Sequence, residues 1–258
     1  MRAWEVAGWA FFAYVAAVAV LLPGLPPSSR RRALMGAGAG LALTAFATWL
    51  PASQVLHDWV LPPLLLLLGY WASGALFVAP MAGAERVLDG TDRALGISAV
   101  AARTPRALAE LLELAYLGVY PLIPLALALH VLYTPNPDAS LFWTVVLVTD
   151  FICFGMLPMV QTRPPRALEP VDPWRSSVRP LNLRLLGAAS NQVNTFPSGH
   201  AAEALAAALL VTGAPLPTVV TMWIAALAVT AGAVLGRYHY TLDALAGWVV
   251  ALVVWLMV

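Results

Sequence analysis

The stretch "VLPPLLLLLGYWASGALFVAP" occupies residues 60–80 and contains no charged side chain. The hydrocarbon core of a bilayer needs roughly 20 apolar helical residues for each crossing. Comparable apolar blocks recur at residues 4–22, 33–50, 109–132, 140–160, 197–213, 217–235 and 242–258. The alternating pattern of a transmembrane β-barrel is missing. The sequence therefore predicts an all-α fold, a polytopic transmembrane helical bundle of about eight spans.

The composition agrees with a membrane protein and disfavours several other classes. The chain has 258 residues, of which 61% are hydrophobic and 10% charged, with a formal net charge of +1. It has no basic stripe that would indicate a nucleic-acid partner. The single cysteine, Cys153, lies inside an apolar block and has no partner for an internal disulfide. Two long polar connections, 83–106 and 161–196, are expected at the membrane interface.

The basic residues, all of them arginine, are distributed unequally between the two sides of the predicted bundle. With eight spans, every arginine except Arg2 falls on one side. The positive-inside rule assigns that side to the cytoplasm. We therefore expect an integral protein of a bacterial inner (plasma) membrane.

Three polar clusters lie at span ends on this arginine-rich side: "QTRPPR" at 161–166, "NTFPSGH" at 194–200 and "RYHYTLD" at 237–243. Because they share a side, they can meet in one pocket. In the second cluster, Ser198 can cap a helix, and Gly199 lets a ligand approach the free backbone amides, as in helix starts that bind phosphate. In the third, His239 and Asp243 are four residues apart, so the carboxylate can orient the imidazole as a nucleophile.

Arginine side chains in these clusters suit a phosphate ligand. Arg163, Arg166 and Arg237 offer forked donors that match the oxygens of a phosphate group. Together with the helix start and the histidine–aspartate pair, they predict a pocket for an anionic, phosphate-bearing substrate.

At this point the sequence resembles the type 2 phosphatidic acid phosphatase superfamily. "RP" at 163–164, "PSGH" at 197–200 and "HYTLD" at 239–243 are similar to its three signature motifs in order and spacing. The resemblance covers about residues 60–258. It implies a six-helix phosphatase core there, with residues 1–59 forming two accessory transmembrane helices.

Two positions depart from the family pattern. A lysine before the first motif and an arginine before the last histidine are replaced by Met156 and Ala233. With "RPPR" and "YLGVYPLIP" at 116–124, these departures resemble the branch that contains inositol phosphorylceramide and sphingomyelin synthases. Arg166 and Arg237 are candidates to replace the missing charges.

The resemblance implies metal-independent phosphoryl transfer on a lipid phosphate, with no cofactor. His239 would attack phosphorus to form a phosphohistidine, Asp243 would orient it, and His200 would act as the acid and base. Arg163, Arg166, Arg237, Ser198 and Gly199 would bind the phosphate. The acceptor is either water, as in a lipid phosphatase, or an alcohol such as inositol, as in a lipid phosphotransferase. The sequence leaves the lipid and the oligomeric state open.

Two carboxylates inside predicted spans are further candidates, Glu203 one turn after His200 and Asp150 in "VTDFICFG". Burying a charge in the bilayer costs at least ~2.5–3.5 kcal/mol, so such residues commonly serve function. Glu203 could tune His200 or receive a polar acceptor group, and Asp150 could pair with an arginine or remain protonated, so both are candidates to support the site without contacting the phosphate. They could also line the pathway of a transporter, although the polar residues gather on one side. A metal hydrolase using His200, Glu203, His239 and Asp243 is a further alternative.

Overall fold

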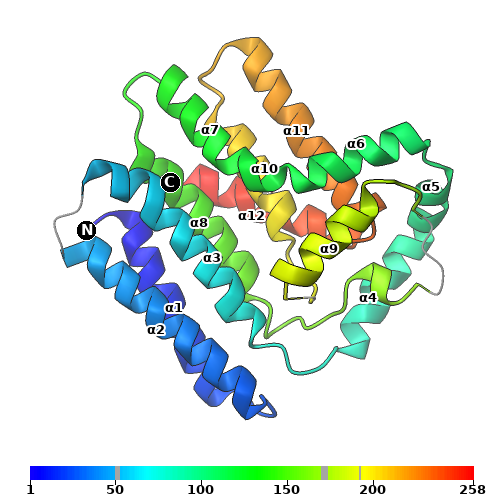
Figure 1. The fold of residues 1–258 in the computed structure, drawn as a ribbon, viewed down its shortest axis with the longest axis horizontal. Helices are drawn as coiled ribbons and strands as arrows, with labels where there is room; N and C mark the ends of the chain where they lie inside the picture. The colour runs from blue at the N-terminus through cyan, green and yellow to red at the C-terminus, as the bar shows by residue number, and fades with distance from the viewer. Residues whose placement is uncertain (50–52, 170–173, 192) are drawn as a thin grey trace.

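The computed structural model describes residues 1–49, 53–169, 174–191 and 193–258 (Figure 1). The described chain is helical, and its only β-type pairing is an isolated bridge between Thr162 and Asn194. The elements, in chain order, are α1 (Ala3–Leu21), α2 (Pro27–Trp49), η1 (Leu56–Val60), α3 (Leu61–Gly74), α4 (Ala82–Ala94), α5 (Ile97–Arg103), α6 (Arg106–Leu117), α7 (Val119–Tyr133), α8 (Ala139–Gly155), η2 (Pro165–Ala167), α9 (Arg179–Ala189), α10 (Gly199–Leu210), α11 (Leu216–Leu235) and α12 (Thr241–Met257).

Each of the eight predicted apolar blocks contains at least one of these helices, so the all-α prediction is confirmed. Judged by length and composition, two helices of the described chain, α1 and α11, could each cross a membrane alone. The bent pair α6 and α7 would make a third span, while α8, α10 and α12 are apolar but shorter. The number of spans therefore stays a prediction.

The block predicted at 109–132 is not one straight helix. Its two halves, α6 and α7, meet at an angle of 63° around Gly118. Pro121 and Pro124 follow in the first turns of α7, and a proline cannot donate the backbone hydrogen bond of a continuous helix. The bend lets α6 turn toward α9 and α11, while α7 packs against α10.

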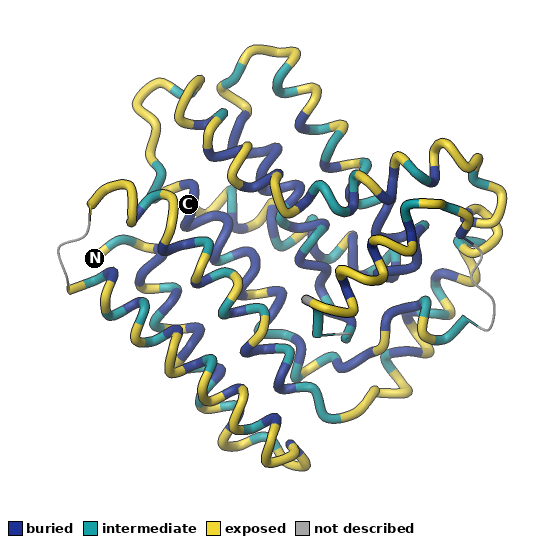
Figure 2. Tube along the Cα trace, in the orientation of Figure 1, coloured by how far each residue is buried: buried dark blue, intermediate teal, exposed yellow. Residues whose placement is uncertain are grey.

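Buried residues gather where α8, α10 and α12 pack together (Figure 2). Helix α10 is rich in alanine, and its buried face contacts α7, α8, α11 and α12. Small side chains allow the helices to approach closely, as is common in membrane bundles. At Gly247 of α12, an added Cβ would lie only 2.4 Å from the carbonyl oxygen of Ser198. This contact fixes the start of α10 beside the start of α12.

The N-terminal helices α1 and α2 form a hairpin along one side of the molecule (Figure 1). Helix α1 packs against α2 and α8, and α2 packs against α3. Phe11 of α1 stacks on Phe151 of α8 with ring centroids 4.1 Å apart. The division of the chain at residue 59 stays a prediction, since the hairpin and the remaining helices share one hydrophobic core.

The apolar block at 60–80 ends its helix at Gly74, before the end of the block. The following segment is held by Gln161, whose side-chain oxygen accepts hydrogen bonds from the backbone amides of Val78 and Ala79. The amide of Met81 donates to the carbonyl oxygen of Gln161 at 2.7 Å. The first polar motif is thereby anchored to the connection between α3 and α4.

Candidate active site

A cavity of about 500 Å³ lies among α3, α7, α8 and α10 and reaches the loop between α11 and α12. Its lining is mostly apolar and aromatic, with four ionisable side chains besides tyrosine: Arg166, His200, Glu203 and His239. These four come from three separate parts of the sequence. The predicted convergence of the three motifs therefore occurs in this structure.

His239 follows the short turn that ends α11, and its backbone amide donates to the carbonyl oxygen of Ala233 at 2.9 Å. Its Nδ1 atom lies 3.6 Å from Oδ2 of Asp243, in ion-pair range but longer than a hydrogen bond. Nδ1 faces the carboxylate, so Nε2 is the ring nitrogen left for the cavity. Burial, followed by the nearby Arg166 charge, lowers the pKa of His239 to about 3. The imidazole is therefore neutral at physiological pH, as a nucleophile requires.

Asp243, in the first turn of α12, is fully buried and held on several sides. Its Oδ2 atom accepts hydrogen bonds from the side chain of Asn194 at 2.8 Å and from the amide of Tyr240 at 2.9 Å. Asn194 is itself fixed, because its side chain also donates to Thr162 at 2.9 Å. The three motifs are thus joined behind His239 by one hydrogen-bond network, and Asn194 has a positioning role that the sequence analysis did not assign.

His200 stands in the first turn of α10, with its ring centroid 5.9 Å from that of His239. Tyr116 stacks on the His200 ring with the ring centroids 5.0 Å apart, and Tyr238 stacks on Tyr116 with the ring centroids 4.2 Å apart. Tyr120 meets the His200 ring edge-on at 5.8 Å. The Nε2 atom of His200 is buried and has no hydrogen-bond partner among the described residues. These aromatic contacts position the ring and leave one nitrogen available for proton transfer.

The aromatic stack rests on a buried ion pair. The hydroxyl of Tyr238 donates to Glu113 of α6 at 2.7 Å, and Arg179 of α9 donates to the same carboxylate at 3.1 Å. Asn182 also donates to Glu113. Both charged side chains are almost completely buried, so removing Arg179 would leave the buried Glu113 carboxylate without this ion pair.

Arg166 is the predicted phosphate-binding arginine that lines the cavity. Its guanidinium lies 5.2 Å from the centroid of the Tyr238 ring, and its amide donates to the carbonyl oxygen of Arg237. Burial lowers its pKa, although a guanidinium stays charged throughout the physiological range. No carboxylate of the described chain forms a salt bridge with it. The cavity therefore contains a positively charged side chain that has no salt-bridge partner among the described residues.

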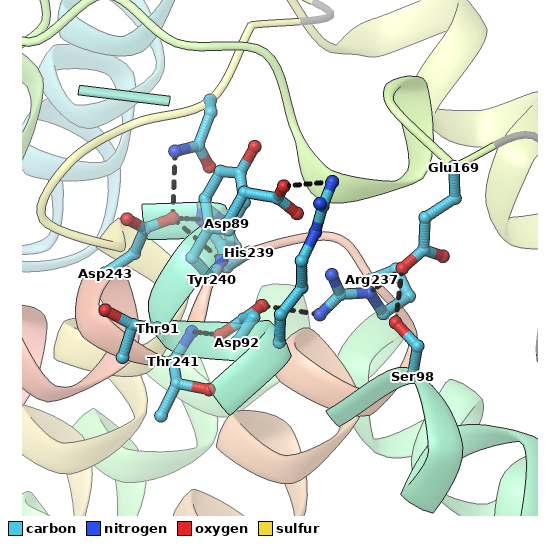
Figure 3. A network of polar contacts seen from close by, with 12 residues as sticks. Asp89, Thr91, Asp92, Ser98, Glu169, Arg237, His239, Tyr240, Thr241 and Asp243 are labelled. Atoms are coloured by element: carbon cyan, nitrogen blue, oxygen red, sulfur yellow. Dashed lines mark hydrogen bonds and ion pairs between the residues drawn. The ribbon is translucent and has the colours of Figure 1, made fainter. Parts of the chain in front are cut away.

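Arg163 and Arg237 do not line the cavity, because carboxylates hold them elsewhere. The guanidinium of Arg163 donates to both oxygens of Glu85 at 3.0 and 2.8 Å, and its side chain is 48% exposed. Arg237 is only 1% exposed and pairs with Asp92 at 2.6 Å and Glu169 at 2.8 Å (Figure 3). This geometry does not favour either as a phosphate ligand.

Helix α4 provides two of these three carboxylates. Its buried residues are Glu85, Leu88 and Asp92, spaced so that they share one face. Asp92 also accepts a hydrogen bond from the amide of Thr241, the first residue of α12. Arg237 has a φ of 59°, a left-handed conformation that a non-glycine residue rarely adopts, so the contacts with α4 and Glu169 secure a strained turn.

The start of α10 has the predicted capped form. The side chain of Ser198 accepts a hydrogen bond from the amide of Ala201 at 3.3 Å, and the amide of Ser198 donates to the carbonyl oxygen of Asp243. Ser198 is fully buried and does not line the cavity, whereas Gly199 does. The N-terminal end of α10 faces the cavity through Gly199, and the Ser198 hydroxyl caps the helix.

The two carboxyl groups that the sequence places inside predicted spans lie near each other. Glu203 lines the cavity one turn beyond His200, and Asp150 of α8 is fully buried behind it. The two carboxyl groups are close enough to interact electrostatically. An added Cβ at Gly199 would lie 3.4 Å from Asp150, so the pair also sits against the start of α10. In the described part of the chain, no three histidine, cysteine or acidic side chains gather as ligands for a metal.

Comparison with known proteins places these motifs in a family. A model of the PAP2 superfamily, the type 2 phosphatidic acid phosphatases, matches residues 86–257. Searches of curated proteins and of solved structures gave no match. The matched range covers all three motifs and more than half of the sequence. The chain therefore belongs to the PAP2 superfamily.

Proposed function

We propose that the protein is an integral membrane, metal-independent lipid phosphatase that works through a phosphohistidine on His239. The observation that carries this proposal is the polar end of the cavity. Two histidine rings 5.9 Å apart meet there beside Arg166, which has no carboxylate partner in the described chain. Membership of the PAP2 superfamily supports a phosphatase or phosphotransferase activity. The apolar remainder of the cavity suits the hydrocarbon part of a lipid.

In the first step, the phosphate group binds between Arg166 and the backbone amides at the start of α10. Nε2 of neutral His239 attacks phosphorus in line, while Nδ1 keeps its proton directed at Asp243. The bond from phosphorus to the lipid oxygen breaks. His200, which is protonated once the anionic phosphate is bound beside it, transfers its proton to that oxygen, so the lipid leaves as an alcohol and His200 becomes neutral.

In the second step, neutral His200 takes a proton from a water molecule as the water oxygen attacks phosphorus. The bond between phosphorus and Nε2 of His239 breaks, and inorganic phosphate leaves. His239 returns to its neutral form and His200 to its protonated form, so atoms and charges balance over the cycle. An alcohol in place of water would give a new phosphodiester or phosphate ester through the same intermediate, as in the synthase branch that the motifs resemble.

We further propose that the apolar helices form about eight spans, with the site on the cytoplasmic face of a bacterial inner membrane. The two proposals rest on the apolar blocks and on the arginine bias. Labelling of single cysteines in the loop before α9, from each side of intact membranes, tests the orientation. Labelling of Ser176→Cys only from the cytoplasmic side is expected, and labelling only from the opposite side would contradict the assignment.

The activity is tested with purified protein in detergent on a panel of polyprenyl, glycerolipid and sphingolipid phosphates, with and without inositol or glycerol. We expect phosphate release from at least one lipid, and its loss by at least ~10²-fold in His239→Ala and His200→Ala. His57→Gln is the matched control, because His57 lies outside the cavity. Activity that survives His239→Ala would overturn the mechanism. New lipid formed with an added alcohol would instead identify the phosphotransferase alternative.

Chelators separate the metal hydrolase from this proposal. The steps above need no divalent ion, so phosphate release is expected to be unchanged in excess chelator. Loss of activity that a divalent metal restores would favour a metal site built from the same histidines and carboxylates.

A further inference from the structure

The carboxyl pair of Glu203 and Asp150 has no part in the proposed phosphoryl transfer. Neither oxygen of Asp150 receives a hydrogen bond from an N–H or O–H group of the described chain. Asp150 is fully buried, and Glu203 is the member of the pair that reaches the cavity. Two neighbouring carboxyl groups can share one proton, which leaves the pair with a net negative charge and several free acceptor positions.

The depth of Glu203 in the cavity follows from the directions of the helices. Helices α7 and α10 run the same way, since Tyr120 meets His200 near their starts and His130 bonds to the carbonyl oxygen of Leu210 near their ends. Glu203 is three residues beyond His200, or about 4.5 Å further along the α10 axis. Glu203 therefore lies deeper along α10 than His200.

Beyond the level of Glu203 the described lining is apolar. Ile123, Pro124 and Leu127 of α7 continue the wall in the same direction, and Trp143 and Pro63 complete it from α8 and α3. The hydrocarbon chain of a substrate would occupy this part. The carboxyl pair is thus placed between the phosphate site and the chain site, beside the atoms that join a lipid's phosphoester to its hydrocarbon.

The chemistry of the pair limits which group can occupy that position. A carboxylate repels the phosphate group, which is consistent with a phosphate site at Arg166 instead. An ester carbonyl or a bare isoprenoid chain offers no hydrogen to a carboxylate, and burying the pair against either would leave its acceptors unsatisfied. A hydroxyl or amide N–H would satisfy them.

We propose that Glu203, backed by Asp150, recognises a hydrogen-bond donor on the lipid backbone next to the phosphoester. The inference rests on the proposed function and deepens it by naming the substrate class. That class is a lipid phosphate whose backbone carries a free hydroxyl or amide N–H, such as a monoacyl glycerol phosphate or an N-acyl sphingoid phosphate. Polyprenyl and diacylglycerol phosphates lack this donor and are poorer substrates.

The test uses lipid pairs that differ only in the donor. The first pair is a 1-O-alkylglycerol 3-phosphate and its 2-deoxy analogue, and the second is an N-acyl sphingoid 1-phosphate and its 3-deoxy analogue. A third pair compares the same N-acyl sphingoid 1-phosphate with its N-methyl amide analogue, which lacks the amide N–H. We expect wild-type kcat/KM to favour the donor-bearing member of at least one pair by about tenfold or more, the usual effect of a hydrogen bond to a charged group. The pair that shows the preference identifies the glycerol or the sphingoid backbone.

Variants show whether the carboxyl pair produces the preference. Glu203→Leu and Asp150→Asn should bring the ratio between the paired lipids toward one. Leu127→Ala is the control, because it removes apolar cavity wall and should weaken both members of a pair equally. A merely structural role for the pair would lower stability and leave the ratio unchanged. An unchanged ratio in folded Glu203→Leu protein, or no preference in the wild type, would overturn the inference.

Binding separates this inference from the proposed function. The same lipid pairs are titrated into His239→Ala protein by calorimetry, where no turnover is needed. If the wild type releases no phosphate from any lipid, the proposed function fails, while a binding preference that Glu203→Leu abolishes would still support donor recognition. Equal binding of the paired lipids would contradict it.

Discussion

Replacing Arg166 with alanine removes the cation that faces the cavity without a carboxylate partner. In the proposed complex its planar guanidinium makes two charge-assisted hydrogen bonds to the phosphate, each worth about 1.5–3 kcal/mol. Water can enter the vacated space and recover part of this energy, so the net loss should be about 3–4 kcal/mol. That loss corresponds to a fall of roughly 10²–10³ in kcat/KM. The side chain makes no salt bridge with any described residue, so thermal stability should change little.

The assay is phosphate release by purified protein in detergent, with a thermal melt of the same samples. Arg163→Ala is the matched control, because the half-exposed side chain of Arg163 pairs with Glu85 and does not line the cavity. Its activity should stay within a few-fold of the wild type. The reasoning is refuted if Arg166→Ala keeps activity within about threefold, or if Arg163→Ala alone loses it.

Three further predictions follow from the surroundings of the histidines. Arg237→Ala should lower the free energy of unfolding by about 3–5 kcal/mol, because the buried carboxylate of Asp92 loses its ion pair. Adding Asp92→Asn to this variant should recover part of the loss, as measured by a denaturant or thermal melt. A single variant that is stable but inactive would instead indicate phosphate binding by Arg237. Asn194→Ala should lower kcat about tenfold by releasing Asp243, with KM little changed, and a change in KM alone would contradict a positioning role. Because neutral His239 is the proposed nucleophile and its pKa lies near 3, kcat/KM should fall on acidification only well below pH 6.5, once the values are corrected for ionisation of the substrate. A fall in the corrected kcat/KM with a midpoint near pH 6.5 would contradict this.

The helical character of the fold could be predicted because each apolar block is long enough to bury its own backbone hydrogen bonds. The details of the helices could not, because they depend on contacts between distant segments. The bend at Gly118 divides one expected span into α6 and α7. The early end of α3 depends on Gln161, which holds the following segment from more than 80 positions away in the sequence.

The site was partly predictable for a similar reason. The placement of His200, His239 and Asp243 at span ends on one side was enough to predict that they meet. The motifs alone could not show which of the three arginines faces the cavity. That depends on Glu85 and Asp92 of α4 and on Glu169, which pair with Arg163 and Arg237 and hold them away from the cavity. Glu85 and Asp92 lie in the connection at 83–106, which the sequence predicts only as a long polar segment at the membrane interface, although their spacing already suits one helix face.

Asn194 is a polar residue whose hydrogen-bond partner cannot be identified from the local sequence. It stands in the same polar cluster as His200, where an amide can donate to a carboxylate, but nothing in the local sequence indicates which carboxylate. Its partner, Asp243, is 49 residues away and is brought into contact only by the close packing of α10 and α12 at Gly247.

The covalent intermediate is the central claim, and trapping it is the most direct test. Wild-type and His200→Ala protein are mixed with a lipid phosphate labelled at phosphorus, quenched within milliseconds to seconds in alkali, and analysed by peptide mass spectrometry. We expect acid-labile phosphate on His239 of the wild-type protein and none in His239→Ala. His200→Ala should carry more of it than the wild type if that variant still transfers the phosphoryl group. Phosphate released by an active wild-type enzyme with no label on His239 at any quench time would contradict it.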